Sequence, residues 1–124
     1  GSFCWDQAAN YALGVKDTSS GPNYTSWSEI FAKNFPDVFK NFQELGKTCR
    51  ESGPLAKKYQ DLANLGIAIG ANSRGAVMSH TRKALESGAR KEEIAHVVLL
   101  SLTTIGFPNM IAAMGWVNEV LEGS

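Results

Sequence analysis

The sequence holds only two cysteines, Cys4 and Cys49, which lie far apart and form neither a Cys-x-x-Cys pair nor a metal-ligand spacing. The sequence therefore predicts no metal site and no dithiol redox centre. Spacing alone does not decide whether the two cysteines form a disulfide. Two reduced thiols in a cytoplasmic protein are the interpretation that the usual distribution of disulfides among compartments favours.

Long apolar runs are also missing, since no stretch approaches the roughly 20 residues that a membrane-spanning helix needs. The first residues show neither the basic nor the apolar stretch of a secretory signal. Twelve Lys and Arg balance twelve Asp and Glu, so the chain has no basic field to attract nucleic acid or an anionic membrane. We expect a soluble cytoplasmic protein that binds neither nucleic acid nor membrane.

The composition that is present suits one globular domain. The chain has 124 residues, of which 44% are hydrophobic and 19% charged, and we treat 1–124 as a single domain. Apolar residues recur three and four positions apart, and alternation with a period of two is almost missing. The pattern predicts an all-α fold of about six helices.

Proline, glycine and short polar segments mark the ends of the predicted helices. Pro36 suits a first helical turn, Gly88 suits the position just after a helix, and Asn72-Ser73 should form a bend. A short helix at 6–15 precedes one that Ser26 would cap. The helix capped by Ser26 ends at Phe35-Pro36, and the next covers 36–50. A further helix carries an apolar stripe from Leu55 and Tyr59 to Ile69, and the one after the bend turns Val77, His80 and Ala84 inward and stops at Ser87-Gly88. The last two predicted helices are 90–105 and one that carries Met110 to Leu121.

Residues 90–105 are apolar around most of the circumference of the predicted helix. The run Val97-Val98-Leu99-Leu100 fits a buried strand equally well by periodicity, and the length of the segment decides for a helix. We expect this helix to be buried on most sides. A chain this short has too little surface of its own to cover such helices, which predicts a homo-oligomer.

Residues 54–123 carry a series of short motifs in a fixed order. Asp61 on one helix is followed by a bend, then by Ser79-His80-Thr81-Arg82-Lys83-Ala84-Leu85, by Gly88-Ala89-Arg90-Lys91-Glu92-Glu93-Ile94 and by Gly106-Phe107-Pro108. The order and spacing resemble the carboxymuconolactone decarboxylase and alkylhydroperoxidase-D family. This resemblance implies a small all-helical domain that assembles as a trimer or hexamer.

The resemblance also separates two branches of that family. The peroxidase branch has Cys-x-x-Cys-x-x-x-His at the start of the histidine helix, and counting back from His80 puts Ser73 and Ala76 at the cysteine positions. Neither residue supplies the thiolate that peroxide reduction needs. The lactone decarboxylase branch does without these cysteines. Twelve residues before Ser73 the family has a glutamate, and here Asp61 is shorter by one methylene.

We therefore predict a cofactor-free lyase or isomerase that acts by proton transfer on a small-molecule carboxylate or lactone. Loss of carbon dioxide from an unsaturated lactone acid leaves an enolate to be protonated, a task for a histidine with a pKa near neutrality. His80 would be this acid or base and Asp61 its orienting partner, close to it across a small pocket. Arg74 would hold the substrate carboxylate, and Ser73 would donate a hydrogen bond to the enolate.

Each of these roles has a plainer alternative. His80 would then be a histidine satisfied within the core, and Asp61 would pair with Lys57 or Lys58 on a wet helix surface. The whole chain would then be a non-catalytic oligomeric binding module that kept the fold. A thiol hydroperoxidase, or peroxiredoxin-type antioxidant protein, that uses Cys49 or Cys4 ranks last, because neither cysteine begins the helix of His80.

Overall fold

The structure is a computed structural model in which residues 27–123 are described, and every regular element in this range is a helix. The helices are α2 (Trp27–Asn34), α3 (Pro36–Glu51), α4 (Lys57–Gly70), α5 (Arg74–Glu86), α6 (Lys91–Leu100), α7 (Leu102–Ile105) and α8 (Phe107–Glu122). The predicted all-α fold is confirmed. The predicted helix at 6–15 and the cap at Ser26 lie outside the described residues. None of the described helices combines the length and apolar character needed to cross a membrane.

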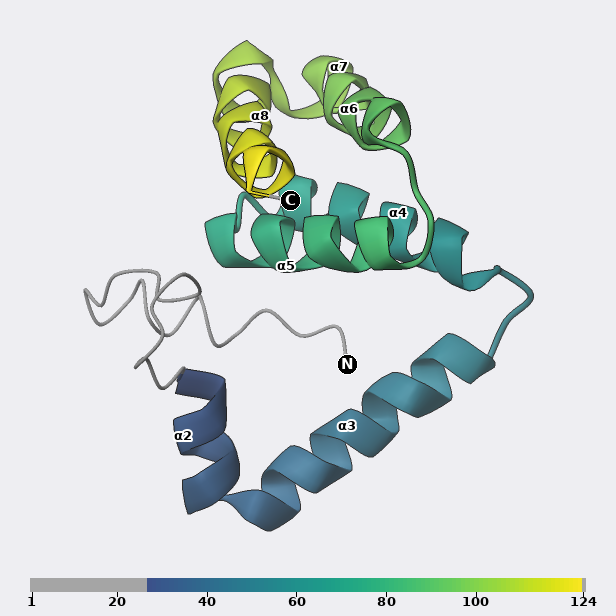
Figure 1. The fold of residues 1–124 in the computed structure, drawn as a ribbon, viewed down its shortest axis with the longest axis vertical. Helices are drawn as coiled ribbons and strands as arrows, with labels where there is room; N and C mark the ends of the chain where they lie inside the picture. Colours follow the sequence, from purple (N-terminus) through teal and green to yellow (C-terminus); the bar gives the residue numbers. More distant parts are fainter. Residues whose placement is uncertain (1–26, 124) are drawn as a thin grey trace.

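The core lies between two layers of helices. An antiparallel pair, α4 and α5, forms one layer, and α6, α7 and α8 cover it (Figure 1). Each helix of the core presents apolar residues at helical spacing toward this interface, as amphipathic helices do. The buried cluster consists of Leu65, Ala68 and Ile69 from α4, Ala76, Val77 and Ala84 from α5, Ala89, Ile94 and Val98 from α6 and the turn before it, and Met110, Ala113 and Val117 from α8.

A bend at Asn72-Ser73 joins α4 to α5, as the sequence predicts. Asn72 has a φ of 55°, a left-handed conformation that asparagine tolerates better than most residues. Ser73 is the N-cap of α5, and its hydroxyl oxygen accepts a hydrogen bond from the backbone N–H of Ala76 at 3.3 Å. The bend turns the chain back on itself, so that α5 packs along α4.

The segment 90–105 differs from its prediction in two ways. It forms two helices, α6 and α7, that meet at Ser101, whose hydroxyl donates to the carbonyl of Val98 at 2.6 Å and competes with the regular helical pattern. The prediction that this segment is buried on most sides is wrong for the single chain. Leu99 and Leu100 are 52% and 59% exposed, because α4 and α8 cover only one side of α6.

Helix α3 stands apart from the core. Its start at Pro36 is confirmed, and together with α2 it extends away from the layers formed by α4–α8 (Figure 1). None of its sixteen residues is buried. Val38 and Leu45 are each more than half exposed, although their spacing is that of an amphipathic helix.

The inward face of α4 is also different from the predicted one. The sequence predicts an apolar stripe that includes Leu55 and Tyr59, but Leu55 precedes the helix and both side chains are more than half exposed. The buried residues of α4 begin one turn later, with Asp61 and Leu65. The early apolar residues face away from the core because α5 and α6 pack on the other side of α4.

We predict that Leu65→Ala lowers the free energy of unfolding by about 2–5 kcal/mol, since Leu65 is fully buried at the centre of the core. The matched control on the same helix is Ile67→Ala. Its side chain is 69% exposed, so the change should be below about 0.5 kcal/mol. Urea unfolding followed by circular dichroism measures both, and equal losses would contradict this description of the core.

Candidate functional site

His80 lies in the middle of α5 on its buried side, with Val77 and Ala84 on the same inward stripe that the sequence predicts. Its side chain is only 6% exposed. The ring nitrogen Nδ1 is buried and has no hydrogen-bond partner among the described residues. A buried nitrogen without a partner is uncommon in folded proteins and calls for an explanation.

The surroundings of His80 lower its pKa from 6.5 to about 4. Burial is the largest cause, because it penalises the charged imidazolium, and the positive charge of Lys83 one turn later adds to it. The negative charge of Asp61 acts in the opposite direction but is the smaller effect. Desolvation therefore outweighs the carboxylate, and His80 is neutral at pH 7.

Asp61 lies on α4, the helix packed along α5, and is 3% exposed. Its Oδ2 accepts a hydrogen bond from Nζ of Lys57, one turn earlier, at 3.0 Å. The alternative that Asp61 pairs with Lys57 is thus confirmed. Its other part, that Asp61 lies on a wet helix surface, is wrong, because Asp61 is buried. The predicted contact between Asp61 and His80 remains a prediction, and the Nδ1 of His80 makes no hydrogen bond to the carboxylate.

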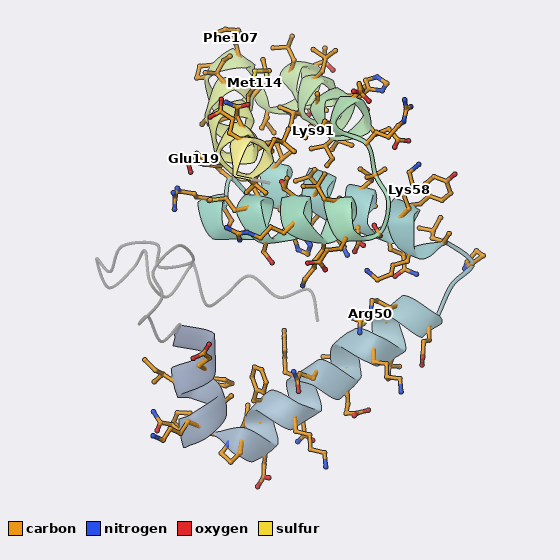
Figure 2. The ribbon with its side chains drawn as sticks, viewed as in Figure 1. Arg50, Lys58, Lys91, Phe107, Met114 and Glu119 are labelled. Carbon is orange, nitrogen blue, oxygen red and sulfur yellow. The ribbon has the colours of Figure 1, made fainter. Side chains whose placement is uncertain are left out.

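Ser73 and Arg74 lie at the N-terminal end of α5, and each side chain already has a partner within the fold. Ser73 caps the helix and shares a face with His80, seven residues and about 10 Å along the axis. Arg74 turns to α8, where its Nη2 lies 3.0 Å from Oε2 of Glu119. Glu119 lies beside the N-terminal end of α5 (Figure 2). The structure therefore places Ser73, but not Arg74, on the side of α5 that carries His80.

None of the four predicted site residues lines either of the following two hollows in the described part of the chain. One, of about 380 Å³, lies between α4 and the α6–α7 pair. The other, of about 480 Å³, lies between α3 and α4 and includes Arg50 and Gln60 in its wall. Sequence reasoning missed this second hollow, because no motif marks it. Within residues 27–123, no group of three His, Cys, Asp or Glu side chains is arranged to hold a metal ion.

We predict that the Hε1 resonance of His80 titrates near pH 4 in an NMR experiment, and the variant His96→Gln assigns the two histidine signals. Between about pH 6.5 and 4 the unfolded chain binds this proton and the folded chain does not. Acidification through this window should therefore destabilise the fold, and His80→Gln should lose that part of the pH dependence. A midpoint above 6.5 would mean that Asp61 dominates over burial.

Comparison with known proteins agrees with this architecture. The model of the carboxymuconolactone decarboxylase family matches residues 36–119, which begins at α3 and reaches into α8. The match therefore extends beyond the region in which the motifs are found. An uncharacterized protein of Methanocaldococcus jannaschii is 30% identical over 92 residues, which cover 74% of this chain and 86% of that protein.

The matched region contains every element on which the candidate site depends. It includes α4 with Asp61, the bend, and α5 with His80. The order of these elements is the one that the motifs of the sequence predict. The chain belongs to the carboxymuconolactone decarboxylase family.

Proposed function

We propose that the protein is a cofactor-free lyase or isomerase that moves a proton on a small carboxylated or lactone-like substrate. Membership of the family supports this class of reaction. The observation that carries the proposal is the Nδ1 of His80, a basic nitrogen held inside the fold without a hydrogen-bond partner among the described residues. Such a nitrogen is available to accept a proton from a substrate.

The low pKa of His80 determines the order of the steps in the proposed reaction. The neutral imidazole acts first as a base and takes a proton from a carbon next to a carbonyl group, which leaves an extended enolate. The imidazolium formed is a strong acid for a histidine, because burial keeps its pKa low, and it returns the proton to the far end of the enolate. The proton is moved and not consumed.

A decarboxylation needs the same histidine in its protonated form, because the enolate left after loss of carbon dioxide must receive a proton. The negative charge of a bound carboxylate raises the pKa of a nearby histidine and so favours the imidazolium. Asp61, already buried on the facing helix, contributes in the same direction. In this proposal the carboxylate of Asp61 stabilises the positive charge of the imidazolium, and the hydrogen bond from Lys57 keeps Asp61 in position.

The proposed roles of Ser73 and Arg74 differ in what they require. Ser73 would donate its O–H to the enolate oxygen while its oxygen still accepts from the N–H of Ala76. Arg74 would have to exchange Glu119 for the substrate carboxylate. The present partners of both residues favour a second candidate function, a non-catalytic oligomeric binding module. A thiol peroxidase has less support, since Cys49 is an exposed residue of α3 and Ser73 and Ala76 begin the histidine helix.

We predict that His80→Ala slows exchange of substrate carbon-bound protons with D₂O by a factor of about 100 or more, the usual contribution of a general base. Proton NMR on a panel of unsaturated lactone acids measures this exchange for each compound in turn. Asp61→Asn should cost about tenfold, roughly one pKa unit of lost charge stabilisation.

The matched control is His96→Ala, which removes an exposed histidine of α6 and should leave the exchange rate unchanged. If His80→Ala instead lowers the melting temperature by several degrees while no substrate exchanges in the wild type, His80 is a core histidine and the binding module is favoured.

We further propose that the chain assembles as a trimer or hexamer. Large apolar side chains are exposed along α6 and α8, among them Leu100 at 59% and Phe107 at 60%. Phe107 lies at the end of α8 farthest from α3 (Figure 2). Exposed apolar side chains that gather on neighbouring helices favour association with another surface.

Light scattering should therefore give a mass three or six times the 13.4 kDa of the chain. Leu100→Asp should lower this mass at micromolar concentration with no loss of helix, because a charge in an apolar contact is unfavourable. Asn118→Asp, an exposed polar residue of α8, is the control and should leave the mass unchanged. A wild-type chain that stays monomeric would refute the assembly.

A further inference from the structure

The hollow between α3 and α4 contains a cationic side chain with an unused donor. Arg50 lies near the C-terminal end of α3, on the side of that helix facing the rest of the chain (Figure 2). Its Nη1 is buried and has no hydrogen-bond partner in the described part of the chain. Within residues 27–123 no carboxylate forms an ion pair with this guanidinium. A buried donor on a permanent positive charge strongly favours an acceptor from outside the fold.

The walls around Arg50 are apolar. Leu45 from α3, Leu55 from the connection and Ile67 from α4 line the hollow, and each is more than half exposed. Arg50 is the only charged residue among those that line it. The volume of about 480 Å³ lies within the range of sites for small molecules.

The angle between the two walls is held by a side chain that bridges them. The Nε2 of Gln60 on α4 donates to the carbonyl of Arg50 at 3.0 Å and to the carbonyl of Leu55 at 2.7 Å. These bonds fasten the end of α3 and the connection to the first turns of α4. The hollow is therefore formed before any ligand arrives, which lowers the entropic cost of binding.

We propose that this hollow binds a small monocarboxylate with an apolar body. The carboxylate would pair with the guanidinium of Arg50, and the apolar body would lie against Leu45, Leu55 and Ile67. One charged residue in the wall matches one negative charge, whereas a phosphate dianion would leave a charge without a partner. A guanidinium also suits the planar geometry of a carboxylate.

This site is separate from His80. Gln60 and Asn64 line the hollow, while Asp61 is buried toward the other face of α4. Binding at Arg50 therefore does not depend on the proposed reaction, and each of the two can fail without the other.

Calorimetric titration with 2-naphthoate tests the site. We expect the wild type to bind this probe and Arg50→Gln to bind it about tenfold more weakly or worse, the usual effect of losing a charged hydrogen bond. Lys47→Gln, which removes an exposed cation on α3 outside the hollow, should bind as the wild type does. The neutral analogue 2-naphthalenemethanol should bind wild type and Arg50→Gln alike. Equal binding of 2-naphthoate by both would overturn the proposal.

Cys49 provides a second measurement that needs no variant. This free, exposed thiol lines the hollow, so bound 2-naphthoate should slow its alkylation by iodoacetamide, followed by mass spectrometry of its peptide. An unchanged alkylation rate at saturating probe would overturn the site. A third outcome would also overturn the site: Cys49 resists alkylation before any probe is added, and the oligomer binds no 2-naphthoate. A second copy of the chain would then fill the hollow.

Discussion

The packing of α5 along α4 is the interaction on which the rest of the molecule depends. It requires a sharp reversal at Asn72, a left-handed residue, and the side-chain cap of Ser73 satisfies a backbone N–H that the reversal would leave free. Small residues such as Ala68 and Ala76 let the two helices meet in the core. The remaining core helices add to this pair, since α8 packs mainly on α5 and α6 packs on both α4 and α8.

The same packing determines the chemistry of His80. Two ionisable side chains, His80 and Asp61, are drawn out of water when the helices meet, and their fates differ. Asp61 keeps a hydrogen-bonded cation through Lys57, whose own side chain is mostly exposed. The Nδ1 of His80 has no such partner among residues 27–123, so the imidazole responds to burial by staying neutral. A neutral, buried histidine is suited to accept a proton. The proposed reaction therefore begins with His80 acting as a base.

Helix α3 shows the opposite situation, an amphipathic helix that keeps apolar residues such as Val38 and Leu45 exposed in the described part of the chain. Gln60 fastens the connection between α3 and α4, and in this arrangement Leu45 is more than half exposed. The result is a hollow with a cation in its wall. Apolar side chains are also exposed on α6, where Leu99 and Leu100 face away from the core. These surfaces account for the separate proposals of a ligand between α3 and α4 and of assembly through α6 and α8.

Local patterns in the sequence determined the helices and their ends. Pro36 at a helix start, Gly88 with a φ of 97° after a helix, and the bend before α5 depend on neighbouring residues alone, and all three were predictable. The inward stripe of Val77, His80 and Ala84 follows from helical periodicity in the same way. Only the tertiary structure decided which apolar faces are covered, because that depends on where other helices lie. Burial of Asp61, exposure of Leu99, the hollow beside Arg50 and the low pKa of His80 all follow from such long-range contacts, to which no local spacing is sensitive.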